Sequence, residues 1–591
     1  MNLNQRIAIT LIFLLFFVVG RAQADRPACY KLLPAKTLAY VRIANLKELG
    51  EAANDTSFGR MMQEDSFQSL TQHLFSEAET AFEPVAEQIG LSLSEILEIP
   101  RGEIAIAVTA PPNGLPAPVL MIDIEGHEAN VLKLTDALEK RIELDGNLQK
   151  STEVERGTKL TVFAQEADTR FTGLIHFQRE EMLVMTSNLD VAKQILAAWD
   201  GDDEQAVLEQ NDDFADVMRH SKGPREAVPQ IRWFVDPISF AKVAMRGNFG
   251  AQAGLAMLPV VGADGLLALG GSITLATEEY DSFVQTHVIT AEPRTGVLAA
   301  LAMKSGDPTP EKWVPHDAAS YTTLYWDFER TETEVSLLFD SFRGEDAFQR
   351  EVISQINKTL DVEFEEDLLG VLSGRASLAT WYTKPTRINS TAFLGGIQLV
   401  EDHDFEQTLK HIIEYTDNNL EERSWAGFTI WSTPAPELPE DAEETNAMTP
   451  QPNQPALALV DDYLLLSNRP EHIERAITAR SDSTRSLASE LDFKLMASKI
   501  RRQPRGRTPG MFSFQRPEEG LRMLYELATA ESTRAGMANS DNEFLSRLNG
   551  QLDEKPLPPF SKLKDYFAPQ SSIMTVDDNG FHYTSIGLRR K

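Results

Sequence analysis

The stretch KGPREAVPQ at residues 222–230 has a counterpart, RQPRGRTPG, at residues 502–510. A displacement of 280 residues superposes the two stretches, and their cations and prolines then coincide. The coinciding pairs are Arg219 with Lys499, Lys222 with Arg502, Pro224 with Pro504, Arg225 with Arg505, and Pro229 with Pro509. A basic, proline-restricted turn that occurs twice at a long interval indicates two copies of a larger unit.

The correspondence extends outward in one order, with displacements that drift between 272 and 298 residues. The further pairs are 33–43 with 314–324, 96–106 with 368–378, 124–128 with 400–404, 183–188 with 463–468, and 283–289 with 581–587. We therefore predict two tandem homologous domains, 30–300 and 314–591, joined by a Pro-rich linker at 301–313. The period is too long for a solenoid of short repeats.

The second copy contains an insertion that the first lacks. Residues 433–455 are rich in proline and acidic side chains and nearly devoid of apolar ones. Such a composition cannot bury an apolar face, so we predict that this segment is disordered.

Each copy shows the pattern of an α+β fold. In the first copy, runs of strand length alternate with segments of helical periodicity. The predicted strands are 38–43, 103–108, 117–124, 181–187, 230–236, 270–276 and 281–289, and the predicted helices are 128–143, 188–199 and 237–246. Short connections and alternating faces favour a largely antiparallel sheet with helices packed on it.

The N-terminus has the pattern of a signal peptide. A short positive segment precedes the apolar run 7–20, and Ala22 and Ala24 are small residues suited to signal peptidase. We predict cleavage before Asp25 and export to the periplasm, the cell surface or the medium; an uncleaved N-terminal anchor is the alternative. No other apolar run is long enough to span a membrane.

The charge of the whole chain is −33, and removal of residues 1–24 with their two arginines gives −33 − 2 = −35. So acidic a protein disfavours nucleic acid or anionic lipid as a partner. Cys29 is the single cysteine, which excludes an internal disulfide, and we interpret it as a free thiol near the mature N-terminus. Because Arg26 stands three residues before it, a lipoprotein signal is excluded.

Two motifs place a histidine between acids where a strand leads into a helix. They consist of Glu125, His127 and Glu128 in the first copy and Glu401, His403 and Asp404 in the second. Neighbouring residues rarely converge on one metal ion, so acids that stabilise a helix N-terminus are the preferred interpretation. By the same reasoning Ser187-Asn188 and Ser467-Asn468 are predicted N-caps, and Pro237 and Pro517 fit first helical turns.

The sequence lacks the motifs of an activated nucleophile, a phosphate-binding glycine loop, a dinucleotide fold or a calcium loop. It predicts no catalytic residue, no metal and no cofactor. Two hypotheses remain. The preferred one is a non-catalytic exported module for binding, scaffolding or envelope association, with an anionic glycan or another envelope protein as possible partner. The alternative is an extracytoplasmic hydrolase that acts on a polymer through two carboxylates.

The segments LPAKTLAYVRIANLKEL (33–49) and SFGRMMQEDSF (57–67), behind a signal peptide, carry a resemblance. The chain resembles a family of large exported bacterial proteins that are known only as a domain of unknown function. The resemblance implies export and an uncharacterised role, and it brings no catalytic residues.

The basic loops remain the candidate contact sites. A compact cluster of Arg and Lys can bind carboxylate or sulfate even on an acidic protein. The candidate anion contacts are Arg219, Lys222, Arg225, Lys499, Arg502 and Arg505. The alternative is that these cations balance neighbouring acids through weak exposed ion pairs.

Overall fold

The structure is a computed structural model. It describes residues 26–111, 115–145, 148–164, 173–400, 405–416, 419–435, 447–503, 509–540, 549–550, 552–553 and 556–590. The chain forms two compact units, which we describe separately. Unit 1 contains the described residues of Met1–Met257 together with Leu266–Thr290, and unit 2 contains Leu258–Gly265 together with those of Ala291–Lys591.

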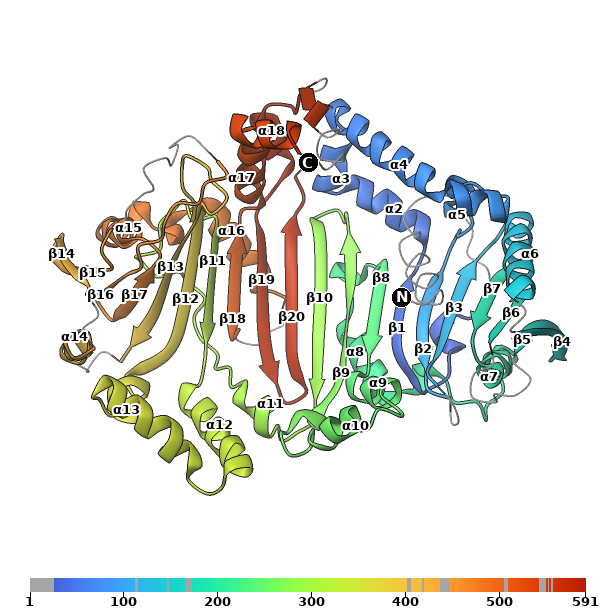
Figure 1. Ribbon diagram of the computed structural model, residues 1–591, viewed down its shortest axis with the longest axis horizontal. Coiled ribbons are helices and arrows are strands. Elements are labelled where there is room, and N and C mark those ends of the chain that lie inside the picture. Colours follow the sequence, from blue (N-terminus) through green and yellow to red (C-terminus); the bar gives the residue numbers. More distant parts are fainter. Residues whose placement is uncertain are drawn as a thin grey trace. The chain divides into compact units, whose positions relative to one another are not determined.

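Unit 1 is built on an antiparallel sheet with the strand order β4-β5-β6-β7-β3-β2-β1-β8-β9-β10 (Figure 1). Its strands are β1 (Thr37–Ile43), β2 (Ile104–Thr109), β3 (Ala117–Asp123), β4 (Gln149–Glu155), β5 (Thr158–Ala164), β6 (Leu174–Arg179), β7 (Met182–Thr186), β8 (Ile231–Val235), β9 (Leu266–Leu275) and β10 (Tyr280–Thr290). The predicted strands therefore all form, with ends that differ by a few residues. The sequence did not predict β4, β5 and β6.

Helices cover both faces of this sheet. They are α2 (Leu46–Asp55), α3 (Ser57–Met62), α4 (Asp65–Ile89), α5 (Leu93–Leu97), α6 (Glu128–Asp145), α7 (Leu189–Trp199), α8 (Asp212–His220), α9 (Pro237–Ala244) and α10 (Phe249–Ala256). Met182 and Val184 of β7 pack in the main core with α7 and α8. Leu183, between them, points to the other face and packs with residues of α6. The alternation of β7 side chains thus serves two helical layers.

Unit 2 has an antiparallel sheet with the order β14-β15-β16-β17-β13-β12-β11-β18-β19-β20. Its strands are β11 (Ser320–Tyr325), β12 (Leu372–Tyr382), β13 (Thr391–Leu399), β14 (Glu421–Trp425), β15 (Phe428–Ser432), β16 (Ala456–Val460), β17 (Tyr463–Ser467), β18 (Met511–Gln515), β19 (Gln570–Asp577) and β20 (Gly580–Leu588). The fold class predicted from the sequence, α+β with a largely antiparallel sheet, is confirmed in both units.

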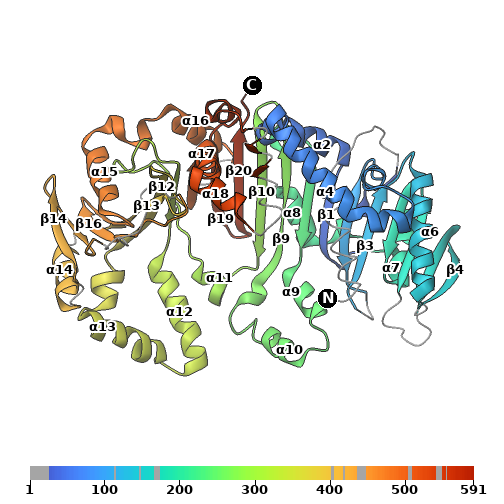
Figure 2. The ribbon, with the colours of Figure 1, turned by 45° about the horizontal axis from the view of Figure 1, so that its top comes forward.

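The helices of unit 2 are α11 (Gly296–Ala300), α12 (Phe328–Arg343), α13 (Ser354–Leu360), α14 (Phe405–Tyr415), α15 (Pro470–Ser481), α16 (Leu491–Ile500), α17 (Pro517–Thr529), α18 (Glu531–Ala538) and α20 (Phe560–Leu563). Apart from α11, which precedes β11, they occupy the same intervals between strands as the helices of unit 1. Figure 2 shows α14 and α15 on opposite sides of β15–β17. Leu464 of β17 packs with α14, whereas the buried neighbours Tyr463 and Leu465 point away from that cluster.

The two units share their strand order and also the register of their strands. One row of facing residues crosses all the strands of each sheet. In unit 1 the row is Ser151, Val162, Ile175, Thr186, Val119, Ala107, Tyr40, Phe234, Gly270 and His287. In unit 2 it is Glu421, Ser432, Ala456, Ser467, Leu394, Ala379, Tyr321, Phe514, Ser571 and Ile586.

Packing on these sheets corresponds as well. Phe214 of α8 meets Phe234 edge-on with ring centroids 5.5 Å apart. Phe493 of α16 meets Phe514 in the same way at 5.4 Å. Corresponding phenylalanines of the two cores thus meet in the same edge-to-face arrangement, which aromatic pairs prefer.

An ion pair ties the β-hairpin at the sheet edge to the following helix in each unit, with inverted polarity. In unit 1, Lys193 of α7 lies 3.1 Å from Glu153 of β4. In unit 2, Glu474 of α15 lies 2.8 Å from Arg423 of β14. The contact is kept while its two charges are exchanged.

The structure corrects the predicted linker at 301–313. These residues belong to unit 2, where the Trp313 side chain is buried against Tyr463 with ring centroids 5.6 Å apart. The preceding Glu311 is buried too and accepts a hydrogen bond from Tyr321. The first unit ends at residue 290 rather than 300. The apolar Trp313 docks this segment onto the core.

The predicted disordered insertion, 433–455, is also corrected in part. Residues 436–446 lie outside the described residues. Beyond them the chain packs, because Ala447 is buried and Ile388 donates its N–H to the Ala447 carbonyl at 2.9 Å. Asn389 exchanges two hydrogen bonds with the backbone of Gln451 at 2.6 and 2.8 Å. Backbone pairing thus orders a segment that has little apolar surface.

The predicted signal peptide, 1–24, lies outside the described residues. Cys29 forms no disulfide but is a fully buried core residue rather than part of a tail. Burial raises the pKa of its thiol well above the usual value, so Cys29 is an inert core side chain. Within the described ranges, no helix combines the length and apolarity needed to cross a membrane.

Candidate functional site

The first basic loop joins α8 to β8, and acids lie beside two of its three candidate cations. Arg219, in the last turn of α8, pairs with Asp216 at 2.6 Å. Arg225 reaches Glu279 at 3.0 Å, in the turn between β9 and β10. Lys222 is exposed. These pairs are those expected if the loop balances local acids.

The second basic loop is described only in part by the structure. Lys499 lies in the last turn of α16, and Arg502 follows that helix as an exposed residue. Arg505 lies outside the described residues. In neither unit does the described part of the loop bring the candidate cations together around one cavity.

The first acid–histidine motif is organised as a helix start. Arg101 donates to Nε2 of His127 at 2.7 Å, so that nitrogen's lone pair is occupied. Burial, with the neighbouring Arg101, lowers the pKa of His127. Glu128 begins α6 and accepts from the Gly126 N–H. Glu401, His403 and Asp404 lie outside the described residues, and the described residues contain no group of three possible metal ligands.

The predicted helix caps are correct in one copy and displaced in the other. Asn188 caps α7 by accepting from the Val191 N–H at 3.2 Å. In unit 2 the N-cap is Arg469, one residue later than predicted. Asn468 instead bonds β13, accepting from the Phe393 N–H and donating to the Thr391 carbonyl. Pro237 and Pro517 occupy the first turns of α9 and α17 as predicted.

A cavity of unit 2 with a volume of about 440 Å³ lies against α15. The helix begins at Pro470, which suits a first turn, and buries Ile473, Ala476 and Ile477 in the core. Its other face supplies one wall of the cavity. That wall consists of Glu471, Glu474, Arg475, Thr478 and Ala479, which recur at helical spacing.

Other segments complete this cavity, which we call the Trp425 pocket. Trp425 ends β14 at a tight turn, where Ala426 and Gly427 have φ values of +47° and +89°. The turn leaves the indole 37% exposed. Pro315, His316 and Arg485 form the remaining wall. An exposed aromatic face thus lies among polar groups of both signs.

Ion pairs hold the charged groups of the Trp425 pocket in place. Arg423 lies over the Trp425 ring, 5.5 Å from its centroid, and pairs with Glu474. Arg475 lies over the Trp381 ring at 4.8 Å and also bonds Asp317. Glu471 is exposed and forms no ion pair with a described residue. The pocket therefore offers one available carboxylate and a positioned aromatic ring.

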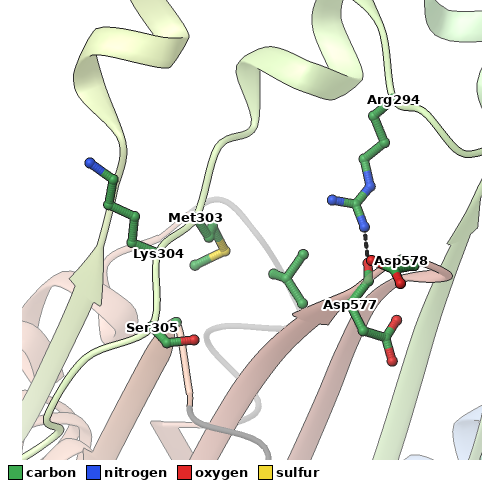
Figure 3. Close-up of a pocket in the computed structure, with 8 residues that line it drawn as sticks. Arg294, Met303, Lys304, Ser305, Asp577 and Asp578 are labelled. Carbon is green, nitrogen blue, oxygen red and sulfur yellow. Dashed lines mark hydrogen bonds between the residues drawn. The ribbon is translucent and has the colours of Figure 1, made fainter.

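A second cavity of unit 2, of about 200 Å³, lies where β19 ends (Figure 3). Arg294 donates to the Asp577 carbonyl and covers the Phe581 ring at 5.0 Å. Lys304 pairs with Asp327 at 3.1 Å. Both cations are already engaged, and the cavity is small, so it ranks below the Trp425 pocket as a ligand site.

The sequence did not single out the residues of the Trp425 pocket. Their only local signal is Trp425 itself, an aromatic side chain in a segment with polar neighbours, SWAGF at 424–428. Its place at a hairpin tip depends on the pairing of β14 with β15, which the sequence did not predict. Searches of protein-family models, of curated proteins and of solved structures found no match to this chain.

Proposed function

We propose that this chain is an exported, duplicated, non-catalytic binding protein and that the Trp425 pocket of unit 2 binds a glycan. The observation that carries the proposal is the exposed Trp425 ring, set among Glu471, Arg475 and Arg485 in a cavity of about 440 Å³. Ligand sites typically combine an apolar surface with a few convergent polar groups in a cavity of this size.

Export is proposed from the signal-peptide pattern of residues 1–24. Duplication is proposed from the repeated basic turn, and the common strand order and register support it. Membership of the exported family of unknown function stays part of this proposal, since it rests mainly on residues 33–67 and on the overall layout of the chain.

A glycan suits the Trp425 pocket for chemical reasons. The face of a sugar ring carries C–H groups that pack on an aromatic ring, and an indole provides the largest such surface. Carboxylates accept hydrogen bonds from sugar hydroxyls, whereas guanidinium groups donate to them. Arg475 and Arg485 form exposed ion pairs with Asp317 and Asp482, which are weak enough for the carboxylate of an acidic sugar to replace them, so an anionic glycan is the preferred class.

Hydrolysis fits the same residues less well. A glycosidase needs two carboxylates on opposite sides of the scissile bond, roughly 5 to 10 Å apart. Glu471 and Glu474 lie one turn apart on a single helix, and Arg423 neutralises Glu474. Binding without chemistry is therefore the main proposal, and a polymer hydrolase is the alternative.

The test is affinity electrophoresis of the mature protein through gels that contain neutral or anionic polysaccharides. We expect retardation by an anionic polysaccharide, and we expect Trp425→Ala to abolish it. Tyr415→Ala is the matched control, because Tyr415 is a 51% exposed aromatic residue of unit 2 that does not line the pocket. Equal migration of wild type and Trp425→Ala in every gel would contradict the proposal, and release of reducing ends would favour the hydrolase.

A further inference from the structure

Unit 1 contains a cluster of buried polar groups at one end of its main core. Tyr40 and Arg42 of β1 lie on the same face of the sheet, because they are two residues apart. Arg232 of β8 is the cross-strand partner of Arg42. The side chain of Tyr40 is only 1% exposed, and Arg42 and Arg232 are partly buried.

The equivalent place in unit 2 contains an internal carboxylate. Tyr321, which corresponds to Tyr40 in the row of facing residues, donates its hydroxyl to Glu311 Oε2 at 2.9 Å. Arg375 Nε lies 2.9 Å from Glu311 Oε1. The Glu311 side chain is 4% exposed. Unit 2 therefore closes this end of its core with a buried tyrosine–carboxylate–arginine contact.

Glu311 reaches that position from the segment that precedes β11. The corresponding segment of unit 1 precedes β1, and both segments make the same backbone contact. The Leu208 N–H donates to the Leu33 carbonyl in unit 1, as the Leu487 N–H donates to the Val314 carbonyl in unit 2. Counting back three residues from these carbonyls places Tyr30 where unit 2 has Glu311. Unit 1 thus lacks a carboxylate on this segment, and its internal carboxylate in this cluster is Glu103, the residue before β2.

Glu103 balances only one of the two arginines of this cluster. Arg42 pairs with Glu103, which also accepts the Cys29 N–H at 3.2 Å. The Arg232 side chain forms no hydrogen bond or ion pair with any described residue, and its buried Nε atom has no acceptor. The buried Tyr40 hydroxyl also has no partner among the described residues. Burial, together with the neighbouring Arg42, lowers the pKa of Arg232.

Such an arrangement is costly, and the fold does not require it. Like charges on facing residues of adjacent strands destabilise a sheet, and a buried donor without an acceptor loses its hydration. Unit 2 has Phe512 at the position of Arg232, and that ring packs on Phe493 with centroids 5.7 Å apart. A phenylalanine thus suffices for the same topology.

We propose that Arg232 and Tyr40 of unit 1, whose buried Nε and hydroxyl have no partner among the described residues, bind a carboxylate group of a ligand beside the Arg42–Glu103 pair. Arg232 is partly exposed and donates two parallel hydrogen bonds to the carboxylate. The Tyr40 hydroxyl donates a third. The site is independent of the Trp425 pocket, since it lies in the other unit and uses none of its residues.

The experiment measures the unfolding temperature of the mature full-length protein during a titration with sodium acetate, the simplest carboxylate probe. Sodium chloride keeps the ionic strength constant, so that screening does not change. Inorganic phosphate is titrated in parallel. A ligand that binds only the folded state raises the unfolding temperature, and the stabilisation grows with the logarithm of one plus the ratio of ligand concentration to Kd.

We expect acetate to raise the unfolding temperature of wild type and Arg232→Phe to weaken this response at least about tenfold, as loss of a charge-assisted hydrogen bond requires. Arg232→Phe installs the residue that unit 2 uses, so folding is preserved. Tyr40→Phe should weaken the response with little effect on the ligand-free protein. Arg219→Gln is the control, because it removes an exposed charge of unit 1 elsewhere.

Three results would overturn the proposal. Absence of any acetate response in wild type would mean that water alone satisfies Arg232 and Tyr40. An acetate response that survives Arg232→Phe would place the carboxylate elsewhere. A response to phosphate that depends on Arg232, without a response to acetate, would mean that the site binds a tetrahedral oxyanion and not a carboxylate.

Discussion

Removal of one phenolic oxygen should affect the two units in opposite ways. In unit 2, Tyr321→Phe deletes the hydroxyl that donates to the buried Glu311 at 2.9 Å. The carboxylate keeps Ser377 and Arg375 as donors but loses a charge-assisted hydrogen bond. The expected loss is about 1.5 to 3 kcal/mol of unfolding free energy, since Glu311 cannot turn to water.

In unit 1, Tyr40→Phe deletes a hydroxyl that has no partner among the described residues. No hydrogen bond is lost, and the desolvation of an unpaired hydroxyl is avoided. The free energy of unfolding should therefore stay constant or rise by about 1 kcal/mol. The two substitutions are chemically identical and lie at equivalent positions of two sheets, so each is the control of the other.

Differential scanning calorimetry in a buffer without carboxylate ions measures both effects. For a unit of this size, 1 kcal/mol changes the unfolding temperature by about 2 °C, so Tyr321→Phe should lower the transition of unit 2 by roughly 3 to 6 °C. Equal destabilisation by both substitutions would refute the assignment of an unpaired hydroxyl to Tyr40. An unchanged Tyr321→Phe would refute the stabilising role of the Glu311 contact.

Three further predictions concern other parts of the chain. Burial lowers the pKa of His472 to about 4, whereas the pKa of an unfolded histidine is about 6.5. The neutral ring of His472 therefore stabilises the fold above pH 6.5, and this contribution is lost as the pH falls to 4. Urea denaturation should show that His472→Phe removes up to about 3 kcal/mol of that decline; an unchanged pH dependence would contradict the buried neutral ring. Gly396→Ala should lower the free energy of unfolding, measured by urea denaturation, by about 1 to 3 kcal/mol, because a Cβ there would lie 2.3 Å from the buried Trp313 ring. Gly395→Ala should be nearly neutral, because the nearest atom to a Cβ there is 3.8 Å away. Replacing the loop cations with serine should leave retention on an anionic resin unchanged at low and high salt if they only balance nearby acids, and earlier elution at low salt would support anion contact. The residues replaced are Lys222, Arg225, Arg502 and Arg505.

The sequence predicted those elements whose residue pattern fits only one kind of secondary structure. Strands such as β2 and β7 are short apolar runs, and α7 begins at a capping asparagine. By contrast, β4 and β14 present QKSTEVE and EERSW, which are exposed over nearly their whole length. A strand that buries neither face has no apolar alternation, so pattern analysis cannot find it.

The sequence comparison also failed to predict the register of some strands. The alignment paired Phe283 with Phe581, but the row of facing residues places Phe283 in the position of His582. A shift of one residue exchanges the two faces of a strand, and a match between two phenylalanines in the sequence does not determine which register is correct. The Trp425 pocket and the cluster of Tyr40, Arg42 and Arg232 likewise combine residues that are far apart in the chain, so neither has a local sequence pattern.

The inverted ion pair at the sheet edges has a consequence for how the chain folds. Two consecutive units with one topology risk exchanging hairpins during folding, since each hairpin finds a similar sheet edge in its neighbour. A β4–β5 hairpin docked on α15 would set Glu153 against Glu474, and a β14–β15 hairpin docked on α7 would set Arg423 against Lys193. Each correct docking is attractive and each exchanged one repulsive, so a contact that adds little stability discriminates between the native chain and its misassembled form.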